Sequence, residues 1–148
     1  MSLQQAIEQV NTINRPAFIP YVMAGDGGLA NLPSIISRLE KLGATAIEIG
    51  IPFTDPVADG PVIEEAGMRA LANGTTLKKV IETLRTNRNE FSIPLIFMSY
   101  LNPILAYGQE QFARDAYEAG VHGVIIPDMP LEEKEILHPY LKASNIAL

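Results

Sequence analysis

Hydrophobic positions along this chain of 148 residues follow two alternating patterns. Short, continuous apolar runs are each followed by longer stretches in which apolar residues recur three or four positions apart. The first pattern is typical of strands that are buried on both faces, and the second is typical of amphipathic helices. The runs predict strands at 17–22, 44–49, 93–98 and 121–126, and the start of a fifth strand at 145–148.

Helical periodicity separates the predicted strands. The first helix is expected after Asn31, which can cap it, with Pro33 in its first turn and an end at Gly43. Its apolar face is Ile35, Ile36, Leu39 and Leu42. Further helices are expected at 62–72, from Thr76 with Leu77, Val80, Ile81 and Leu84 on one face, around Phe112, Ala116 and Ala119 up to Gly120, and from about Leu131 with Ile136, Leu137, Tyr140 and Leu141 buried.

Strands that alternate with helices, without hairpin signals, predict an α/β fold with a parallel sheet. Two architectures fit this order. One is an open doubly wound sheet, and the other is the first half of a (β/α)₈ barrel, which typically needs ~250 residues. The segment Gly25–Gly28 matches the phosphate loop of the open sheet only in part, and a plain turn is the simpler interpretation. The stop inside an apparent fifth strand favours the half-barrel.

Composition narrows the class of protein. The chain is 47% hydrophobic, which is enough for one domain with a sizeable core. Its net charge of −6 argues against nucleic acid as a general partner, because phosphate backbones select basic surfaces. It has no cysteine, and therefore no disulfide framework, zinc-thiolate site or thiol nucleophile. Neither a signal peptide nor an apolar run near the ~20 residues of a membrane span is visible, so we expect a cytoplasmic protein.

The candidate chemistry lies around the second predicted strand. Glu48 sits inside the apolar run, and a buried carboxylate is unfavourable unless it is neutral, paired or hydrogen-bonded. The loop Gly50–Pro61 follows and contains a second acid, Asp59. Two acids that flank a rigid turn suit two separate proton-handling roles at the end of a strand. The alternatives are a structural carboxylate for Glu48 and an ordinary turn pair for Asp59 and Gly60.

The run from Glu48 to Ile63 closely resembles the signature of the tryptophan synthase α chain family. The resemblance continues through the chain, in Phe18–Tyr21, Met98–Pro103 and Pro127–Pro130. Thr54 stands where the family commonly has Ser, which keeps the hydroxyl group. Because the family is a complete (β/α)₈ TIM barrel, the resemblance implies that residues 1–148 are the N-terminal part of a single TIM-barrel domain, with four βα units and the start of strand five.

The resemblance also implies an activity and a mechanism. The family cleaves indole-3-glycerol phosphate to indole and glyceraldehyde 3-phosphate by a retro-aldol reaction that uses no cofactor. Glu48 would then be the general acid/base, and Asp59 would bind the indole N–H and stabilise positive charge on the ring. The lysines agree, because all five fall in helical patterns and none is placed to form a Schiff base. The two histidines lack the spacing of metal ligands.

Four further residues are predicted to line the indole pocket, because they lie at or just beyond strand ends: Tyr21, Met98, Tyr100 and Pro127. For Tyr21 and Met98, plain core packing is the competing interpretation. By resemblance, Asp55 and Asn102 are expected to contact a partner, the tryptophan synthase β chain. A turn cap for Asp55 and a helix cap for Asn102 are the competing interpretations.

The substrate phosphate has no predicted site in this chain. In barrels of this kind it is held by loops after strands seven and eight, beyond the predicted elements. The sequence therefore leaves three hypotheses open: an active α chain, an inactive half-barrel that only assembles or docks a β chain, and a structural half-barrel, excised or designed for folding or assembly. A half-barrel with an open sheet is expected to self-associate.

Overall fold

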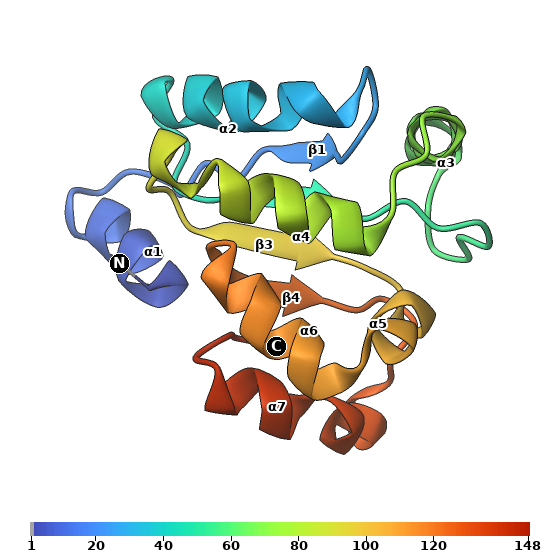
Figure 1. Ribbon diagram of the computed structural model, residues 1–148. Coiled ribbons are helices and arrows are strands. Elements are labelled where there is room, and N and C mark those ends of the chain that lie inside the picture. The colour runs from blue at the N-terminus through green and yellow to red at the C-terminus, as the bar shows by residue number, and fades with distance from the viewer. Residues whose placement is uncertain (1) are drawn as a thin grey trace.

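Four parallel strands pair in the order in which they occur along the chain (Figure 1). The computed structural model describes residues 2–148. Beyond the last strand, Ala147 makes a first rung of further pairing: its N–H donates to the carbonyl of His122 at 3.0 Å, and its carbonyl accepts from the N–H of Val124 at 2.8 Å. The strands are β1 (Tyr21–Met23), β2 (Ile47–Gly50), β3 (Leu95–Met98) and β4 (Val121–Ile125).

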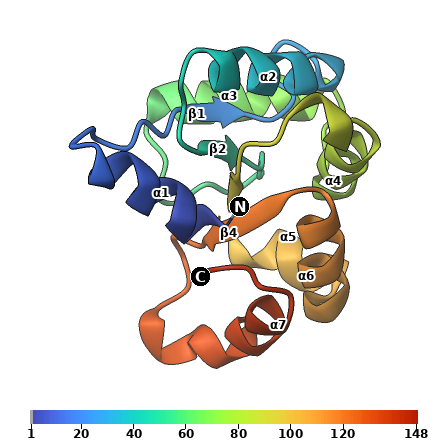
Figure 2. The ribbon, with the colours of Figure 1, turned by 90° about the vertical axis from the view of Figure 1, so that its left-hand side faces the viewer.

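Helices occupy the connections between the strands, as the α/β prediction requires. Figure 2 shows α2, α4, α6 and α7 as an arc around one side of the sheet. In Figure 1, α1 lies at the end where the strands begin, and α3 and α5 lie at the end where they stop. The helices are α1 (Leu3–Thr12), α2 (Leu32–Lys41), α3 (Pro61–Ala72), α4 (Leu77–Thr86), α5 (Leu101–Tyr107), α6 (Gln109–Glu118) and α7 (His138–Ala143), with short 3₁₀ turns at Leu29–Asn31, Arg88–Glu90 and Leu131–Ile136.

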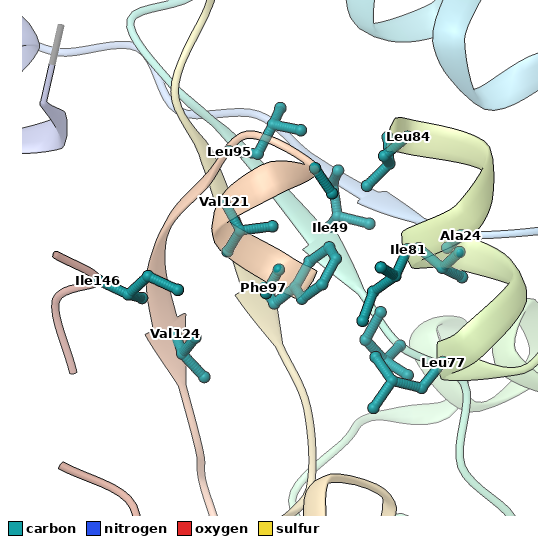
Figure 3. Packing of buried hydrophobic residues seen from close by; sticks show 14 of the residues in the cluster. Ala24, Ile49, Leu77, Ile81, Leu84, Leu95, Phe97, Val121, Val124 and Ile146 are labelled. Carbon is teal, nitrogen blue, oxygen red and sulfur yellow. The ribbon is translucent and has the colours of Figure 1, made fainter. Parts of the chain in front are cut away.

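The main hydrophobic core lies between the sheet and this arc of helices. Ile49 of β2, Phe97 of β3 and Ile81 of α4 gather in the same space (Figure 3), and each is almost fully buried. Because side chains alternate along a strand, these residues define the helix-covered face of the sheet. No helix among residues 2–148 has both the length and the hydropathy to cross a bilayer.

The opposite face of the sheet carries the candidate chemistry. Tyr21, Glu48, Ile96 and Gly123 are aligned by the pairing registers, so their positions form one row across this face. α1 covers the β4 end of this row, because a Cβ on Gly123 would be 3.0 Å from Leu3 Cδ2. Farther along the same face, where the strands end, Ile125 is 44% exposed. We call this side of the sheet the inner face.

Several boundaries differ from the prediction. The single helix predicted from Leu131 was wrong: a 3₁₀ turn ends at Ile136, and α7 starts only at His138. Pro139 explains the break, because it has no N–H to continue the bonds of a longer helix and its ring would collide with the preceding turn. Tyr140, predicted to be buried, is 40% exposed.

Two helices were not predicted, and the first strand is shorter than expected. α1 has a capping box, in which Ser2 and Gln5 exchange side-chain-to-backbone bonds. α5 occupies the segment expected to be a loop after β3. The strand predicted at 17–22 is displaced to β1, although Pro20 still accepts a bond from the N–H of Glu48 at 2.9 Å. Proline has no N–H of its own, which prevents a regular ladder there.

Candidate functional site

Glu48 lies in the middle of β2 and points to the inner face, between Tyr21 and Ile96. Its side chain is half-buried, and burial raises the pKa of the Glu48 carboxyl above its ordinary value. Burial disfavours the charged form, so this carboxyl keeps its proton to a higher pH than a carboxyl in water. A carboxyl with a raised pKa at the end of a sheet is suited to general acid and base chemistry.

Asp59 is held near the inner face by the loop that joins β2 to α3. The loop starts with a sheet-like bond from the Ile51 N–H to the Met98 carbonyl at 2.9 Å. At its far end, the Ala58 N–H donates to the hydroxyl oxygen of Tyr100 at 2.9 Å. Pro61 then opens α3, a position that its fixed φ favours. The loop is therefore attached just before and just after Asp59, which is half-buried.

Tyr100 is the residue that ties this loop to the sheet. It follows β3, is only 2% exposed, and packs its ring on Phe53 with centroids 5.3 Å apart. Burial raises the pKa of the Tyr100 hydroxyl, the bond from the Ala58 N–H opposes that effect, and the nearby Asp59 carboxylate adds to it. Tyr100 thus contacts the loop through both its ring and its hydroxyl.

Tyr21 lies in the same neighbourhood. Its hydroxyl is buried, and no partner for it exists among the residues that the structure describes. The hydroxyl occupies space that Gly50 leaves free, since a Cβ at Gly50 would collide with it. Burial raises the pKa of Tyr21, and the negative charges of Asp59 and Glu48 raise it further. Tyr21 therefore stays a neutral hydroxyl between the two acids.

The other predicted site residues are Met98, on the inner face, and three exposed residues. Met98 pairs with Gly50, which places it on the inner face one step beyond Glu48. Pro127 is exposed, two residues past the end of β4. Asp55 is exposed on the loop and accepts a bond from the Thr54 hydroxyl at 2.7 Å.

Asn102 is exposed in the first turn of α5. Asp128 is not among the predicted site residues, yet its carboxylate accepts the Leu101 N–H at 3.0 Å and so joins the end of β4 to the start of α5. Its position directly after a strand end, next to Pro127, was a usable signal. The structure thus brings Tyr21, Glu48, Asp59, Met98 and Tyr100 together, and places Pro127, Asp55 and Asn102 around them on exposed positions.

Comparison with known proteins gives one consistent family. The sequence model of the family described as tryptophan synthase alpha chain matches residues 7–148. The chain is similar to the tryptophan synthase alpha chain of Oceanobacillus iheyensis, with 50% identity over 145 residues that cover 98% of this chain and 55% of that protein. It is 54% identical over 134 residues to that of Bacillus cereus, covering 90% and 52%.

Solved structures agree with the sequence relatives. Tryptophan synthase subunit alpha from Legionella pneumophila matches with a TM-score of 0.94 and 36% identity, covering 99% of this chain and 57% of that one. A chain of the tryptophan synthase α2β2 complex from Pyrococcus furiosus matches with a TM-score of 0.82 and 35% identity, covering 88% and 52%. The chain therefore spans about half the length of these relatives. The prediction of a (β/α)₈ half-barrel is confirmed.

Proposed function

This chain belongs to the tryptophan synthase alpha chain family, and from that premise we propose that it carries the acid–base residues of a lyase that cleaves indole-3-glycerol phosphate to indole and glyceraldehyde 3-phosphate. The observation that carries the proposal is the pair of acids on the inner face. Glu48 is half-buried on β2 with a raised pKa, and the Asp59 loop is tied beside it by Tyr100. We also propose that the four strands are the N-terminal part of one TIM-barrel domain.

In the proposed reaction, Glu48 donates its proton to the indole carbon that bears the glycerol chain. The ring becomes cationic, and Asp59, which accepts a hydrogen bond from the indole N–H, stabilises that charge. The Glu48 carboxylate then takes the proton of the neighbouring hydroxyl. The O–H electron pair forms the aldehyde C=O, and the electrons of the broken C–C bond return to the ring. Glu48 ends protonated, so the cycle closes without a cofactor.

The proposed roles need different protonation states in the two acids. Glu48 must hold a proton at the working pH, which the raised pKa of a half-buried carboxyl favours. Asp59 must stay anionic beside a developing cation. Tyr21, Met98 and Tyr100 supply the apolar and aromatic surface of an indole pocket on the same face, and we assign Pro127 to its exposed rim.

The test uses a hybrid alpha chain, in which residues 1–148 are continued by the remaining part of the Oceanobacillus iheyensis relative. Glu48→Gln should lower kcat by about 10²-fold or more with KM nearly unchanged, because general acid–base catalysis contributes that much. Asp59→Asn should also lower kcat strongly. Glu133→Gln, an exposed acid on a 3₁₀ turn, is the control. Near-normal turnover by Glu48→Gln would remove Glu48 from the mechanism.

The chain on its own is proposed to be a poor catalyst. Barrels of this class bind substrate phosphate through loops after strands seven and eight, and residues 2–148 form only four strands. We expect the hybrid alpha chain to cleave the substrate and the 148-residue chain to show no measurable turnover. Robust cleavage by the purified chain would mean that the missing loops are dispensable.

A second proposed property is the docking of a β chain, as in the α2β2 complex that the Pyrococcus furiosus relative forms. Asp55 and Asn102 are exposed around the same end of the sheet, where a partner could reach them. Asp55→Lys should weaken binding of a β chain to the hybrid, measured by titration calorimetry, whereas Glu133→Lys should not. Equal affinities in the two variants would argue against this docking surface.

A further inference from the structure

One ion pair joins α3 to the turn that follows β1. The guanidinium of Arg69 donates from Nε to Asp26 Oδ1 at 2.7 Å and from Nη2 to Asp26 Oδ2 at 2.9 Å. Two parallel bonds of this kind fix the relative orientation of both groups as well as their distance. The guanidinium also holds the pKa of the Asp26 carboxyl below its ordinary value, so the pair stays charged.

Two more contacts lie at the same joint. Asn73 donates from Nδ2 to the Gly25 carbonyl at 3.1 Å, one residue before Asp26. Gly25 has a φ of +88°, and a Cβ there would collide with the side chain of Thr75. A larger residue could therefore not lie between the turn and the segment that leaves α3. The joint is a set of polar and close backbone contacts, which we call the α3 clamp: Gly25, Asp26, Arg69, Asn73 and Thr75.

The clamp matters because α3 has little else to hold it. Its buried residues are Ala66, Gly67 and Ala70, all small, and no residue of α3 belongs to the main hydrophobic core. α4, by contrast, buries four large aliphatic side chains in that core. Val62 and Met68 on α3 are 76% and 63% exposed. Apolar packing therefore defines the position of α3 far less than that of α4.

The position of α3 in turn determines the position of Asp59. Gly60 and then Pro61, the first residue of the helix, directly follow Asp59, and the Glu64 N–H bonds the Gly60 carbonyl at 3.0 Å. A shift or rotation of the helix would carry Asp59 with it, away from Glu48. In Figure 1, α3 stands end-on beyond the strand tips. The clamp therefore adds to the small packing contact of α3 with β1, where a Cβ on Gly67 would lie 3.6 Å from Met23 Cε.

We propose that Asp26 and Arg69 are positioning residues, which hold α3 on the turn after β1 and thereby keep Asp59 at its working place on the inner face. This inference rests on the proposed function in one respect only, the catalytic use of Asp59. Arg69 and Asp26 do not touch the substrate in this proposal. Their contribution is geometric, and a displacement of about 1 Å in a reacting group can lower a rate by ~10²-fold.

The first part of the proposal, that the Asp26–Arg69 pair holds α3 in place, is tested on the 148-residue chain itself by amide hydrogen exchange. Arg69→Gln should speed exchange in α3 and in residues 57–60 by about fivefold or more, because the helix opens locally more often. Arg85→Gln is the matched control: Arg85 also lies in the last turn of a helix and pairs with Glu118 at 3.6 Å, away from the loop. Unchanged exchange in α3, or equal loosening of every helix, would overturn the clamp.

The catalytic part is tested in the hybrid alpha chain. Arg69→Gln and Asp26→Asn should each lower kcat by about tenfold with little change in KM, since Asp59 acts mainly in the transition state. Arg69→Lys keeps the positive charge but not the paired bonds. Its kcat should therefore lie between that of these variants and that of the parent. The swapped pair Asp26→Arg with Arg69→Asp should recover part of the loss.

The outcomes separate the two proposals. If the single variants only lower Tm and leave kcat unchanged below it, the pair has a structural role and the positioning proposal is wrong. If the unmodified hybrid has no lyase activity, the proposed function fails, and the exchange experiment still decides whether the clamp holds α3.

Discussion

Tyr100→Phe removes one oxygen atom from the point where the Asp59 loop meets the sheet. The change deletes the acceptor of the Ala58 N–H, a bond of 2.9 Å between residues that are 42 positions apart. It keeps the ring, whose centroid lies 5.3 Å from that of Phe53. The variant therefore separates the hydrogen bond from the packing at the same site.

The expected size follows from the exposure of the two partners. An intramolecular hydrogen bond contributes about 0.5–1.5 kcal/mol net, and more is lost only if a donor stays buried and unpaired. Ala58 is exposed, so water can bond its N–H once the Tyr100 oxygen is gone. We therefore expect a loss of about 1 kcal/mol, which is roughly a fivefold rise in the ratio of molecules with the loop open to molecules with the loop in place.

Exchange of the Ala58 amide, followed by NMR, measures that ratio directly, and kcat/KM of the hybrid alpha chain should fall by no more than the same factor. Tyr107→Phe is the matched control. Its hydroxyl also makes one hydrogen bond, here as the donor to Asp115 Oδ2 at 2.8 Å, but within the α5–α6 region. It should lower stability without speeding exchange at Ala58. Equal protection of Ala58 in Tyr100→Phe and the parent would refute the argument that Tyr100 holds the loop.

Three further outcomes test the inner face. Because burial raises the Glu48 pKa, the folded state binds more protons than the unfolded state, and stability is lost as pH rises through the folded pKa. In thermal melts at pH 8 and pH 4, Glu48→Gln should therefore raise Tm relative to the parent at pH 8 but not at pH 4. Gly50→Ala should lower the free energy of unfolding by about 1–3 kcal/mol through collision with the Tyr21 hydroxyl, and Tyr21→Phe should recover part of this loss in denaturant titrations. The chain should self-associate in sedimentation at micromolar concentration, since Ile125 is 44% exposed on an uncovered face beside incompletely paired strands; a monomer throughout would contradict this.

The order of elements could be predicted from the sequence because each signal was local. Continuous apolar runs placed all four strands to within a few residues, and the spacing of Leu77, Val80, Ile81 and Leu84 placed α4. Thr76 caps that helix through a bond from the Lys79 N–H, as its position suggested. Such features depend on neighbours within a turn or two, so one sequence is enough to recognise them.

The features that could not be predicted from the sequence depend on contacts between distant segments. α5 is a short helix whose first N–H, that of Leu101, is bonded by Asp128, 27 positions away, and nothing near Leu101 indicates that partner. The role of Tyr100 depends on Ala58, and that of Arg69 on Asp26, at separations of 42 and 43 positions. Local periodicity carries no information on pairs of this kind, because the fold must first bring them together.

The site could be found from the sequence because one residue departs from the apolar pattern of the strands. Both faces of β2 and β3 are largely apolar, so alternation alone could not tell the helix-covered face from the inner one. Glu48 is the exception, and its register with Tyr21 and Ile96 fixes which row belongs to the inner face. A carboxyl whose charge opposes folding at neutral pH is a candidate for a functional role, and the proposed reaction is one that needs a proton on it. The residue that weakens the fold is therefore the one that identifies the chemistry.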